Sequence, residues 1–426
     1  MAGRMPPRRR DWSWRSQAFR GLVYQLVAVA LIAFGVWYLA HNTLANMAAR
    51  GIQSGFGFLG QAAGFDIGET LIPYDALDPY WKAFLIGLLN TLRVAIVGIV
   101  LATLLGTLLG VGRFSNNALV RGLCYAYVEL FRNVPVLLQL LMWYLLFTDV
   151  LPSVDAALSI GRVVWLSKHG LSFPLPVWGL GQALAGVGFL VGGVAAWAWR
   201  RHARRRFEAT GHQRSMVLVP LAIVVAAMLV GWIAGGAPTA WSVPKLDGFL
   251  IEGGVSATPE FLAVLVGLVL YTSAFIAEVV RAGIDSVSRG QIEAASSLGL
   301  PKTLSMRLVI LPQALRVIIP PITSQYLNLT KNSSLAVAIG YPDVVSIANT
   351  SLNQTGRAVE CIAIILAVYL TTSRATAALM NWYNRRAAIK ERCWLPPEAA
   401  FGRLPLRGRH QRTGGAGSAV SAWWRR

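Results

Sequence analysis

Charge is scarce in this sequence, and acidic charge is the scarcest kind. Of its 426 residues, 14% are charged, with 19 acidic against 39 basic side chains, while 55% are hydrophobic. Soluble domains carry about a quarter charged residues, so this composition excludes an ordinary soluble protein. Several apolar runs reach about 20 residues, enough to cross roughly 30 Å of hydrocarbon, and they lack the period-two alternation of a membrane barrel. The sequence therefore predicts an all-α polytopic membrane protein.

Residue patterns that support catalysis or metal binding are also missing. The three cysteines, Cys124, Cys361 and Cys393, are far apart and make neither a metal motif nor an even disulfide set. The five histidines fall in predicted loops or the tail, and the sequence has no zinc-protease motif and no nucleophile elbow. The nucleotide-binding pattern Gly-x-x-x-x-Gly-Lys-Ser/Thr does not occur. We expect no catalytic residue, no metal ligand and no cofactor bound by this chain itself.

The basic residues gather in loops beside the apolar runs. A net charge of +20 would suggest a nucleic-acid partner in a soluble protein, but here the positive-inside rule accounts for it. The clearest case is the loop with six arginines between 200 and 214, which should be cytoplasmic. About eight transmembrane helices with both termini cytoplasmic then place every strongly basic loop on one side. The predicted spans are 21–40, 84–111, 125–150, 177–199, 216–236, 258–280, 313–338 and 357–381.

Basic segments precede the first span and follow the last. Residues 1–20 are predicted to form a basic cytoplasmic N-terminus. The span at 21–40 should remain as an uncleaved helix, because a signal peptide has a shorter apolar core and a clear small-residue cleavage site. The basic tail at 384–426 becomes rich in Gly, Arg and Ser, which predicts a disordered cytoplasmic segment.

A long polar loop, residues 281–312, follows the sixth span on the predicted cytoplasmic side. Residues 288–298 favour a short helix that Ser288 can cap, with Gly299 and Pro301 at its end. Its small side chains let a helix sink into a groove of a partner, and Glu293 offers a charged hydrogen bond that fixes the register. Low amphipathicity argues against a helix lying on the membrane. The predicted contacts of this docking loop are Gly290, Gln291, Glu293, Ala294, Ala295, Gly299, Leu311 and Pro312.

The seventh span is rich in proline and in polar residues. Pro312, Pro320 and Pro321 each lack a backbone donor and disfavour regular helix, which predicts a broken span. A broken helix is tolerated at membrane depth only where protein or a water-filled cavity covers it, so polar residues there mark functional candidates. The alternative is that residues 329–336 lie at the outer interface and cap the helix. The candidate pathway or gate residues are Pro320, Pro321, Gln325, Asn328, Lys331, Asn332, Ser333 and Ser334.

Two pairs of opposite charges lie within or beside the spans at helical spacing. Glu278 and Arg281 share one helix face, and so do Glu129 and Arg132. We interpret these four residues as structural or coupling charges rather than as substrate contacts. Arg93, inside the second span, could meet a substrate carboxylate, but snorkelling or ion pairing explains it equally well. Two small-residue motifs allow close helix packing: Gly106-x-x-x-Gly110 and Gly188-x-x-x-Gly192.

The docking loop resembles the signature of bacterial ABC-transporter permease subunits. That signature reads Glu-Ala-Ala, three residues, Gly, nine residues, Ile, any residue and Leu-Pro. In this sequence Glu293-Ala294-Ala295 opens the match, Gly299 follows at the right spacing, and Leu311-Pro312 closes it. Val309 stands where the family has Ile, which is a conservative change.

Three further segments narrow the resemblance to the polar-amino-acid permeases. Residues 129–139 and 277–284 are similar to the start of the second core helix and to the beginning of the coupling loop in that family. Lys331-Asn332-Ser333-Ser334-Leu335 resembles the family's Lys-Asp-Thr-Ser-Leu, and this variant is closer to the general L-amino-acid branch. The resemblance covers residues 84–383.

The resemblance implies a type I ABC-importer permease core of five helices within 84–383. On this interpretation 21–40 is an additional helix, and 177–236 is an inserted helical hairpin that leaves the topology unchanged. The implied partners are an ABC ATPase dimer that binds ATP and Mg and grips the loop, a second homologous permease, and a periplasmic amino-acid-binding protein. The expected function is import of polar or broad-range L-amino acids across the bacterial inner membrane. An ATP-independent secondary transporter or channel is the alternative, but few acids lie within the spans and no inverted repeat is evident.

Overall fold

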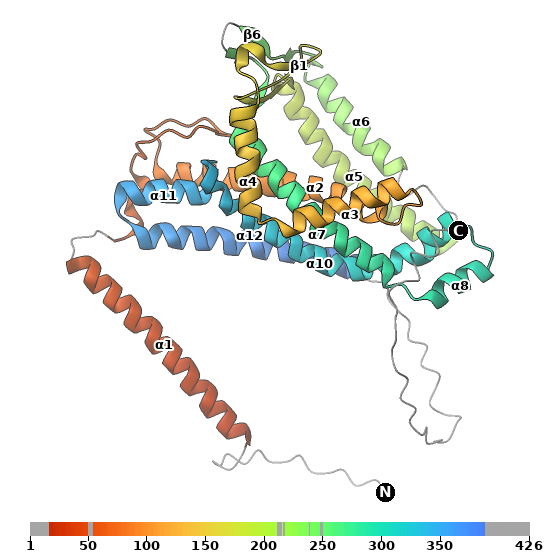
Figure 1. Cartoon of the computed structure of the whole chain (residues 1–426), viewed down its shortest axis with the longest axis horizontal. Coiled ribbons are helices and arrows are strands. Elements are labelled where there is room, and N and C mark those ends of the chain that lie inside the picture. The colour runs from red at the N-terminus through yellow and green to blue at the C-terminus, as the bar shows by residue number, and fades with distance from the viewer. Residues whose placement is uncertain are drawn as a thin grey trace. The chain divides into compact units, whose positions relative to one another are not determined.

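The computed structural model describes residues 17–49, 54–210, 215, 218–237, 239–247 and 250–387 (Figure 1). In these ranges, six helices are long and apolar enough to cross a membrane alone, and one bent pair makes a seventh candidate span. A shorter apolar helix of 17 residues adds an eighth element. These elements follow the order of the eight predicted spans, so the prediction of an all-α polytopic fold is confirmed. The predicted basic N-terminus and tail lie largely outside the described residues.

Long apolar helices make up most of the described chain, because an α-helix satisfies its own backbone groups inside lipid. Short irregular turns lie between these helices or at their ends: η1 (Phe56–Gly60), η3 (Val154–Ala156) and η5 (Ser333–Ile339) are 3₁₀ turns, and η2 (Leu146–Val150) and η4 (Met306–Ile310) are π turns. The α-helices are α1 (Gln17–Ala49), α2 (Tyr80–Gly112), α3 (Ala118–Asn133), α4 (Val136–Leu145), α5 (Leu180–Thr210), α6 (Leu218–Ala234), α7 (Pro259–Asp285), α8 (Arg289–Ser297), α9 (Lys302–Ser305), α10 (Leu311–Asn332), α11 (Val344–Thr355) and α12 (Ala358–Ala387).

Two compact units divide the chain, and the first contains Met1–Leu92 and Pro342–Ala378. Its core joins the start of α2 to α11 and α12, with Phe58 and Val344 fully buried. Gly87 lets α2 and α11 touch, because a Cβ at this position would lie 2.9 Å from the Cα of Val344. The short N-terminal part of α2 is therefore fixed by backbone contact with a distant segment of the sequence.

The second unit contains Arg93–Tyr341 and Leu379–Arg426. Its central helix is α7, which is buried along most of its length and packs against α3, α4 and α10. The later part of α2 also lies close to α7. A Cβ at Gly106 would lie 2.7 Å from the carbonyl oxygen of Ser273, and one at Gly110 would lie 2.9 Å from that of Ala277. The predicted role of this glycine motif in close helix packing is confirmed.

Short strands cluster in the two loops on either side of α5 and α6, beside the ends of these helices (Figure 1). They were not predicted, because strands of two to four residues are too short to show a clear alternation. β1, β2, β3 and β8 form one antiparallel sheet, β4 pairs with β5, and β6 pairs with β7. We call these strands the strand module: β1 (Leu158–Ile160), β2 (Val164–Ser167), β3 (Gly170–Phe173), β4 (Leu175–Pro176), β5 (Trp241–Ser242), β6 (Lys245–Asp247), β7 (Leu250–Glu252) and β8 (Val255–Ala257).

The third predicted span is not one continuous helix. It consists of α3 and of α4 with its π turn, which are bent by 103° relative to each other. Pro135 has no backbone donor and pushes Val134 into an extended conformation, with φ −96° and ψ 127°. Gln139 then donates hydrogen bonds to the carbonyls of Phe131 and Val134, at 3.0 and 2.9 Å, and satisfies groups that the bend leaves open. The span predicted at 125–150 is therefore divided at Pro135 into two helices.

The seventh span was predicted to be broken at its prolines, but its helix is continuous there. Pro320 and Pro321 lie inside α10, which remains α-helical through both of them. Each proline removes one backbone donor, while the buried neighbours Ile318 and Ile322 hold the helix against the core. The irregular turns lie instead at the two ends, as η4 before α10 and η5 after it. The prediction of a span broken at these prolines was wrong.

Candidate functional site

The predicted docking loop leaves α7 through a tight turn. Ser286 ends α7, and its hydroxyl donates to the Gly283 carbonyl at 2.7 Å. Ser288 then takes an extended conformation, with φ −64° and ψ 145°, and occupies the position before the first turn of α8. Its side chain makes no capping hydrogen bond, so the predicted capping role of Ser288 was wrong.

A glycine-centred turn ends α8. Gly299 has a φ of +71°, a conformation that side chains with a Cβ rarely adopt. Its N–H donates to the Ser296 carbonyl at 2.9 Å, and the N–H of Leu300 donates to the Ala295 carbonyl at 3.2 Å. This pair of bonds is the Schellman arrangement, which satisfies carbonyls left open at a helix end. Gly299 therefore fixes the direction in which the chain leaves the docking helix.

The two faces of α8 have different environments. Ile292 and Ala295 are buried, so Ala295 serves the packing of the loop and is not presented at the surface. Glu293 and Ala294 lie on the exposed side, as do Gly290 and Gln291. Leu298, at the end of the helix, is 79% exposed. The loop thus presents one carboxylate, small side chains and an apolar tip at its surface.

The C-terminal part of the loop returns to α10 through the π turn. The amide of Gln313 lies 3.3 Å from the side-chain oxygen of Gln291, which connects the start of α10 to α8. Leu311 is exposed, and Pro312 is half-buried in the first turn of α10, where a missing backbone donor costs little. α8 is therefore connected directly to both α7 and α10.

A cluster of opposite charges lies near the C-terminal end of α7, just before the docking loop. The carboxylate of Glu278 accepts hydrogen bonds from Arg281, one turn later, and from Arg113 at the end of α2, each at 2.5 Å. Arg132 of α3 approaches the same carboxylate at 3.6 Å, and Arg281 also pairs with Asp285 at 2.8 Å. One carboxylate thus connects three helices.

The partner predicted for Arg132 from spacing alone was incorrect. Glu129 is exposed and accepts a hydrogen bond from the amide of Asn133 at 3.0 Å. Arg132 turns instead towards Glu278, and its guanidinium lies 5.5 Å from the centre of the Phe275 ring.

Arg113 was missed as a site residue, because in the sequence it marks only a short basic loop. Its guanidinium stacks on Tyr125 at 4.0 Å.

The candidate pathway residues of α10 and η5 occupy several environments. Pro320, Pro321, Asn328 and Lys331 are exposed, while Gln325, Asn332 and Ser334 are half-buried. Ser333 is buried, and its hydroxyl donates to the Thr330 carbonyl at 2.8 Å. Ser334 donates in the same way to the Lys331 carbonyl at 2.8 Å. Both serines therefore satisfy local backbone groups as the chain changes from α to 3₁₀ geometry.

Two polar residues that the sequence did not single out meet between α2 and α10. The hydroxyls of Thr103 and Tyr326 are 2.8 Å apart, and Thr103 also donates to the Ile99 carbonyl at 2.6 Å. Arg93, on the same helix α2, lies over the ring of Phe261 with 4.0 Å between the guanidinium carbon and the ring centre. These contacts place polar groups of α2 against both α7 and α10.

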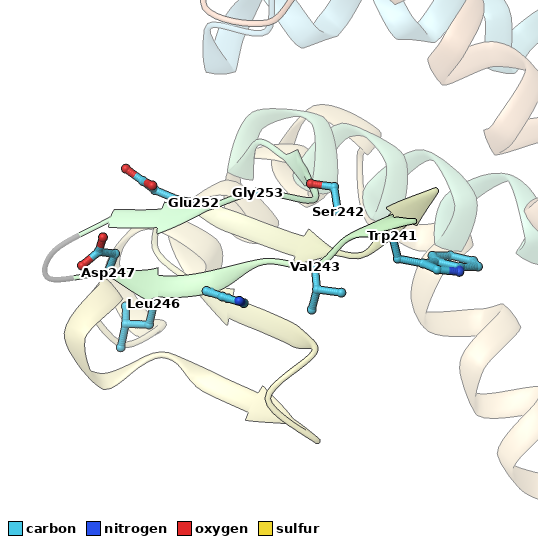
Figure 2. Close-up of a pocket in the computed structure, with 8 residues that line it drawn as sticks. Trp241, Ser242, Val243, Leu246, Asp247, Glu252 and Gly253 are labelled. Atoms are coloured by element: carbon cyan, nitrogen blue, oxygen red, sulfur yellow. The ribbon is translucent and has the colours of Figure 1, made fainter. Parts of the chain in front are cut away.

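A hollow of about 570 Å³ lies in the strand module beside the β6–β7 hairpin. Figure 2 shows the side chains of Ser242 and Glu252 on one side of this hairpin and those of Val243 and Leu246 on the other. Lys245 faces Glu252 across the two strands. No residue that the sequence predicted for a site lines this hollow.

The chain matches known transport proteins over most of its length. The family model of the binding-protein-dependent transport system inner membrane component matches residues 98–389. The general L-amino acid transport system permease protein AapQ of Rhizobium johnstonii is 44% identical over 385 residues, covering 89% of this chain and 96% of AapQ. The putative amino-acid ABC transporter permease protein YhdX of Escherichia coli is 46% identical over 382 residues, covering 89% and 97%.

A third relative extends this likeness. The glutamate/glutamine/aspartate/asparagine transport system permease protein BztB of Rhodobacter capsulatus is 39% identical over 406 residues, covering 88% of this chain and 95% of BztB. The matched residues of the family model include the cluster around Glu278, the docking loop and α10. This chain belongs to the family of binding-protein-dependent transport system inner membrane components.

Proposed function

We propose that this chain is the membrane-spanning permease subunit of an ABC importer for amino acids. The cargo is polar or broad-range L-amino acids, by likeness to the names of AapQ, YhdX and BztB. Both termini and the docking loop lie on the cytoplasmic side, because this orientation leaves every strongly basic loop inside. The chain itself carries no catalytic residue and no bound cofactor or metal, and ATP with Mg is bound by partner subunits.

The exposed face of α8 is the observation that carries this proposal. Glu293, Ala294 and Leu298 project from a short helix whose other face is buried against its own protein. A surface of one carboxylate between small residues suits a groove on an ATPase subunit, because small side chains allow close approach and a charged hydrogen bond fixes the register. Gly290, Gln291, Gly299, Leu311 and Pro312 set the position of this face, and Ala295 anchors it.

Force from the ATPase pair would reach the membrane through the helices attached to the loop. α7 precedes α8 directly, and the contact between Gln291 and Gln313 connects α8 to α10. ATP binding then favours one of two conformations of these helices, since a ligand shifts an equilibrium only by its differential affinity for the two states. Pro320, Pro321, Gln325, Asn328, Lys331, Asn332, Ser333 and Ser334 remain candidates for the pathway or its gate.

The remaining partners follow from the family. A second homologous permease completes the translocation path, two ATPase subunits each hold one docking loop, and a periplasmic amino-acid-binding protein delivers cargo to the outer loops. The strand module, from the loops beside α5 and α6, is the part of this chain that such a protein would meet on the outer side.

The test of this proposal is the variant Glu293→Lys in the assembled transporter. We expect uptake of amino acids to fall about 10-fold or more while the protein remains in the membrane, because a reversed charge opposes the fixed contact with the ATPase. Uptake, ATP hydrolysis and recovery of the ATPase in a mild-detergent pull-down are measured together. Glu252→Lys makes the same charge change at an exposed position away from the docking loop, and as a control it should leave recovery of the ATPase unchanged. Normal coupled uptake by Glu293→Lys would contradict the docking role.

A further inference from the structure

The α5–α6 hairpin has a fixed register. A Cβ at Gly188 would lie 2.3 Å from the Ala227 carbonyl oxygen, and one at Gly192 would lie 2.9 Å from the Val224 Cα, so the two helices touch through backbone. Val224 lies six residues after Leu218, the first residue of α6. Stepping the antiparallel register back by six residues brings Leu218 opposite Ala198. The twelve residues of α5 that follow Ala198, up to Thr210, therefore extend beyond Leu218, by about 18 Å at the helical rise.

Tryptophans mark the depth at which this extension begins. Trp178, just before α5, is 77% exposed, and Trp197 near the start of the extension is 60% exposed. Exposed tryptophans of membrane helices gather at the two membrane–water interfaces. The 18 residues from Leu180 to Trp197 span about 26 Å as a helix, close to the roughly 30 Å of the hydrocarbon layer. Trp197 thus marks the interface, and the residues after it enter the headgroup layer.

The extension carries most of its charge as arginine. Residues 198–210 contain five arginines and one glutamate, and all five arginines are exposed. Trp197, Arg201 and Arg205 follow one another at intervals of four residues and so share one helix face. The guanidinium of Arg201 lies 5.5 Å from the centre of a Trp197 ring. This face combines an aromatic side chain at the interface with two cations above it.

Arg201 lies at the depth of the lipid phosphates, and Arg205 lies within electrostatic range of them. Arg201 lies about 6 Å beyond Trp197 along the helix axis and Arg205 about 12 Å beyond it. The headgroup layer extends about 5–7 Å past the hydrocarbon on each side, and charge acts over roughly 8–10 Å at physiological ionic strength. Arginine forms bidentate hydrogen bonds with phosphate oxygens. A lipid headgroup therefore fits this face better than an acidic protein, because Arg201 lies within the headgroup layer and Arg205 lies close enough beyond it for its charge to act on the phosphates.

We propose that Trp197, Arg201 and Arg205 form a binding site for anionic phospholipid headgroups at this end of the hairpin. The phosphate pairs with the guanidinium groups, and Trp197 packs beside the upper part of the acyl chains. The bound lipid fixes the depth of the hairpin in the bilayer. This site depends neither on the cargo nor on the ATPase, so the lipid-site proposal can be tested independently of the proposed transport function.

The experiment titrates the full chain, purified in neutral detergent, with phosphatidylglycerol and in parallel with phosphatidylcholine. Native mass spectrometry counts the lipids that each sample retains. We expect the parent chain to retain phosphatidylglycerol preferentially, and the double variant Arg201→Gln/Arg205→Gln to bind it about 10- to 30-fold more weakly. Arg162→Gln/Lys168→Gln removes two exposed cations from the strand module at the other end of the same hairpin and should leave binding unchanged.

Several outcomes would overturn the lipid site. Equal loss of phosphatidylglycerol in both double variants would show a response to net charge only, and equal retention of phosphatidylcholine by the parent would show no headgroup selectivity. Displacement of the lipid by inorganic phosphate would assign the site to a free anion. Unchanged lipid retention in Arg201→Gln/Arg205→Gln, with loss of a co-purifying acidic protein, would assign the face to that protein.

Discussion

Asp343 is a carboxylic acid buried without an ionic partner among its described contacts. It begins α11, where its side chain accepts a hydrogen bond from the N–H of Ser346 at 2.8 Å. The Tyr369 hydroxyl lies 3.4 Å from its second oxygen. Burial disfavours the charged form and raises the pKa of Asp343 from 3.8 to about 7, although these hydrogen bonds act in the opposite direction. The residue thus titrates close to physiological pH.

The raised pKa predicts a stability that falls as pH rises. Between about pH 4 and pH 7 the folded chain keeps a proton on Asp343 that the unfolded chain has released, so stability decreases across this window, by up to about 4 kcal/mol. Asp343→Asn keeps an acceptor for Ser346 but cannot titrate, so its Tm in detergent should change less from pH 5 to pH 8 than that of the parent. An identical pH dependence in parent and variant would show that the carboxyl is not buried in this way.

Glu278 connects three helices, and replacing it tests how much this connection contributes to the stability of the chain. Glu278→Gln would leave Arg113, Arg132 and Arg281 close together without their shared carboxylate. We expect a loss of about 1–3 kcal/mol of stability, less than for a fully buried pair because the side chain is half-exposed. The measurement is the Tm of the purified chain in detergent.

The matched control for this variant is Glu129→Gln, on α3. Glu129 is exposed, and among the hydrogen bonds of the described residues it contacts only Asn133. The Tm of the Glu129→Gln variant should therefore differ little from that of the parent. If the two variants lower the Tm equally, the ion pairs of Glu278 contribute nothing specific to the packing of α2, α3 and α7.

Helix positions could be predicted from the sequence because they depend on local properties. A run of about 20 apolar residues sets the length of a span. The Schellman turn at Gly299 was equally readable, since a glycine at a helix end has a local cause. These features need no knowledge of which segment lies beside which.

The missed features depend on contacts between distant segments. Arg132 pairs with Glu278, 146 residues away in the sequence, rather than with Glu129 on its own helix. Pro135 bends its span by 103°, whereas Pro320 and Pro321 do not end α10. The same residue type thus has opposite effects, because buried neighbours hold α10 together and Gln139 satisfies the open carbonyls at the bend.

At the scale of the whole molecule, we propose that the α5–α6 hairpin is an insertion that can be removed. Its two ends are held together by β4 and β5, where Pro176 pairs with Trp241. The N–H of Val177 also donates to the Ala240 carbonyl at 3.0 Å. Two residues placed between Val177 and Ala240 would close a β-hairpin turn. The rest of the chain could then continue from β3 towards α7 with its register unchanged.

We predict that replacing residues 178–239 with Asn-Gly leaves the topology of the remaining helices intact. An even number of spans is removed, so a C-terminal tag should stay on the same side of the membrane, as measured by protease access in inverted vesicles. Removal of α6 alone deletes one span and should move the tag to the other side or prevent insertion. A reversed tag in the 178–239 replacement would mean that α5 and α6 do not cross the membrane as a pair. An unchanged tag, with selective binding of phosphatidylglycerol lost, would assign the lipid site to the hairpin.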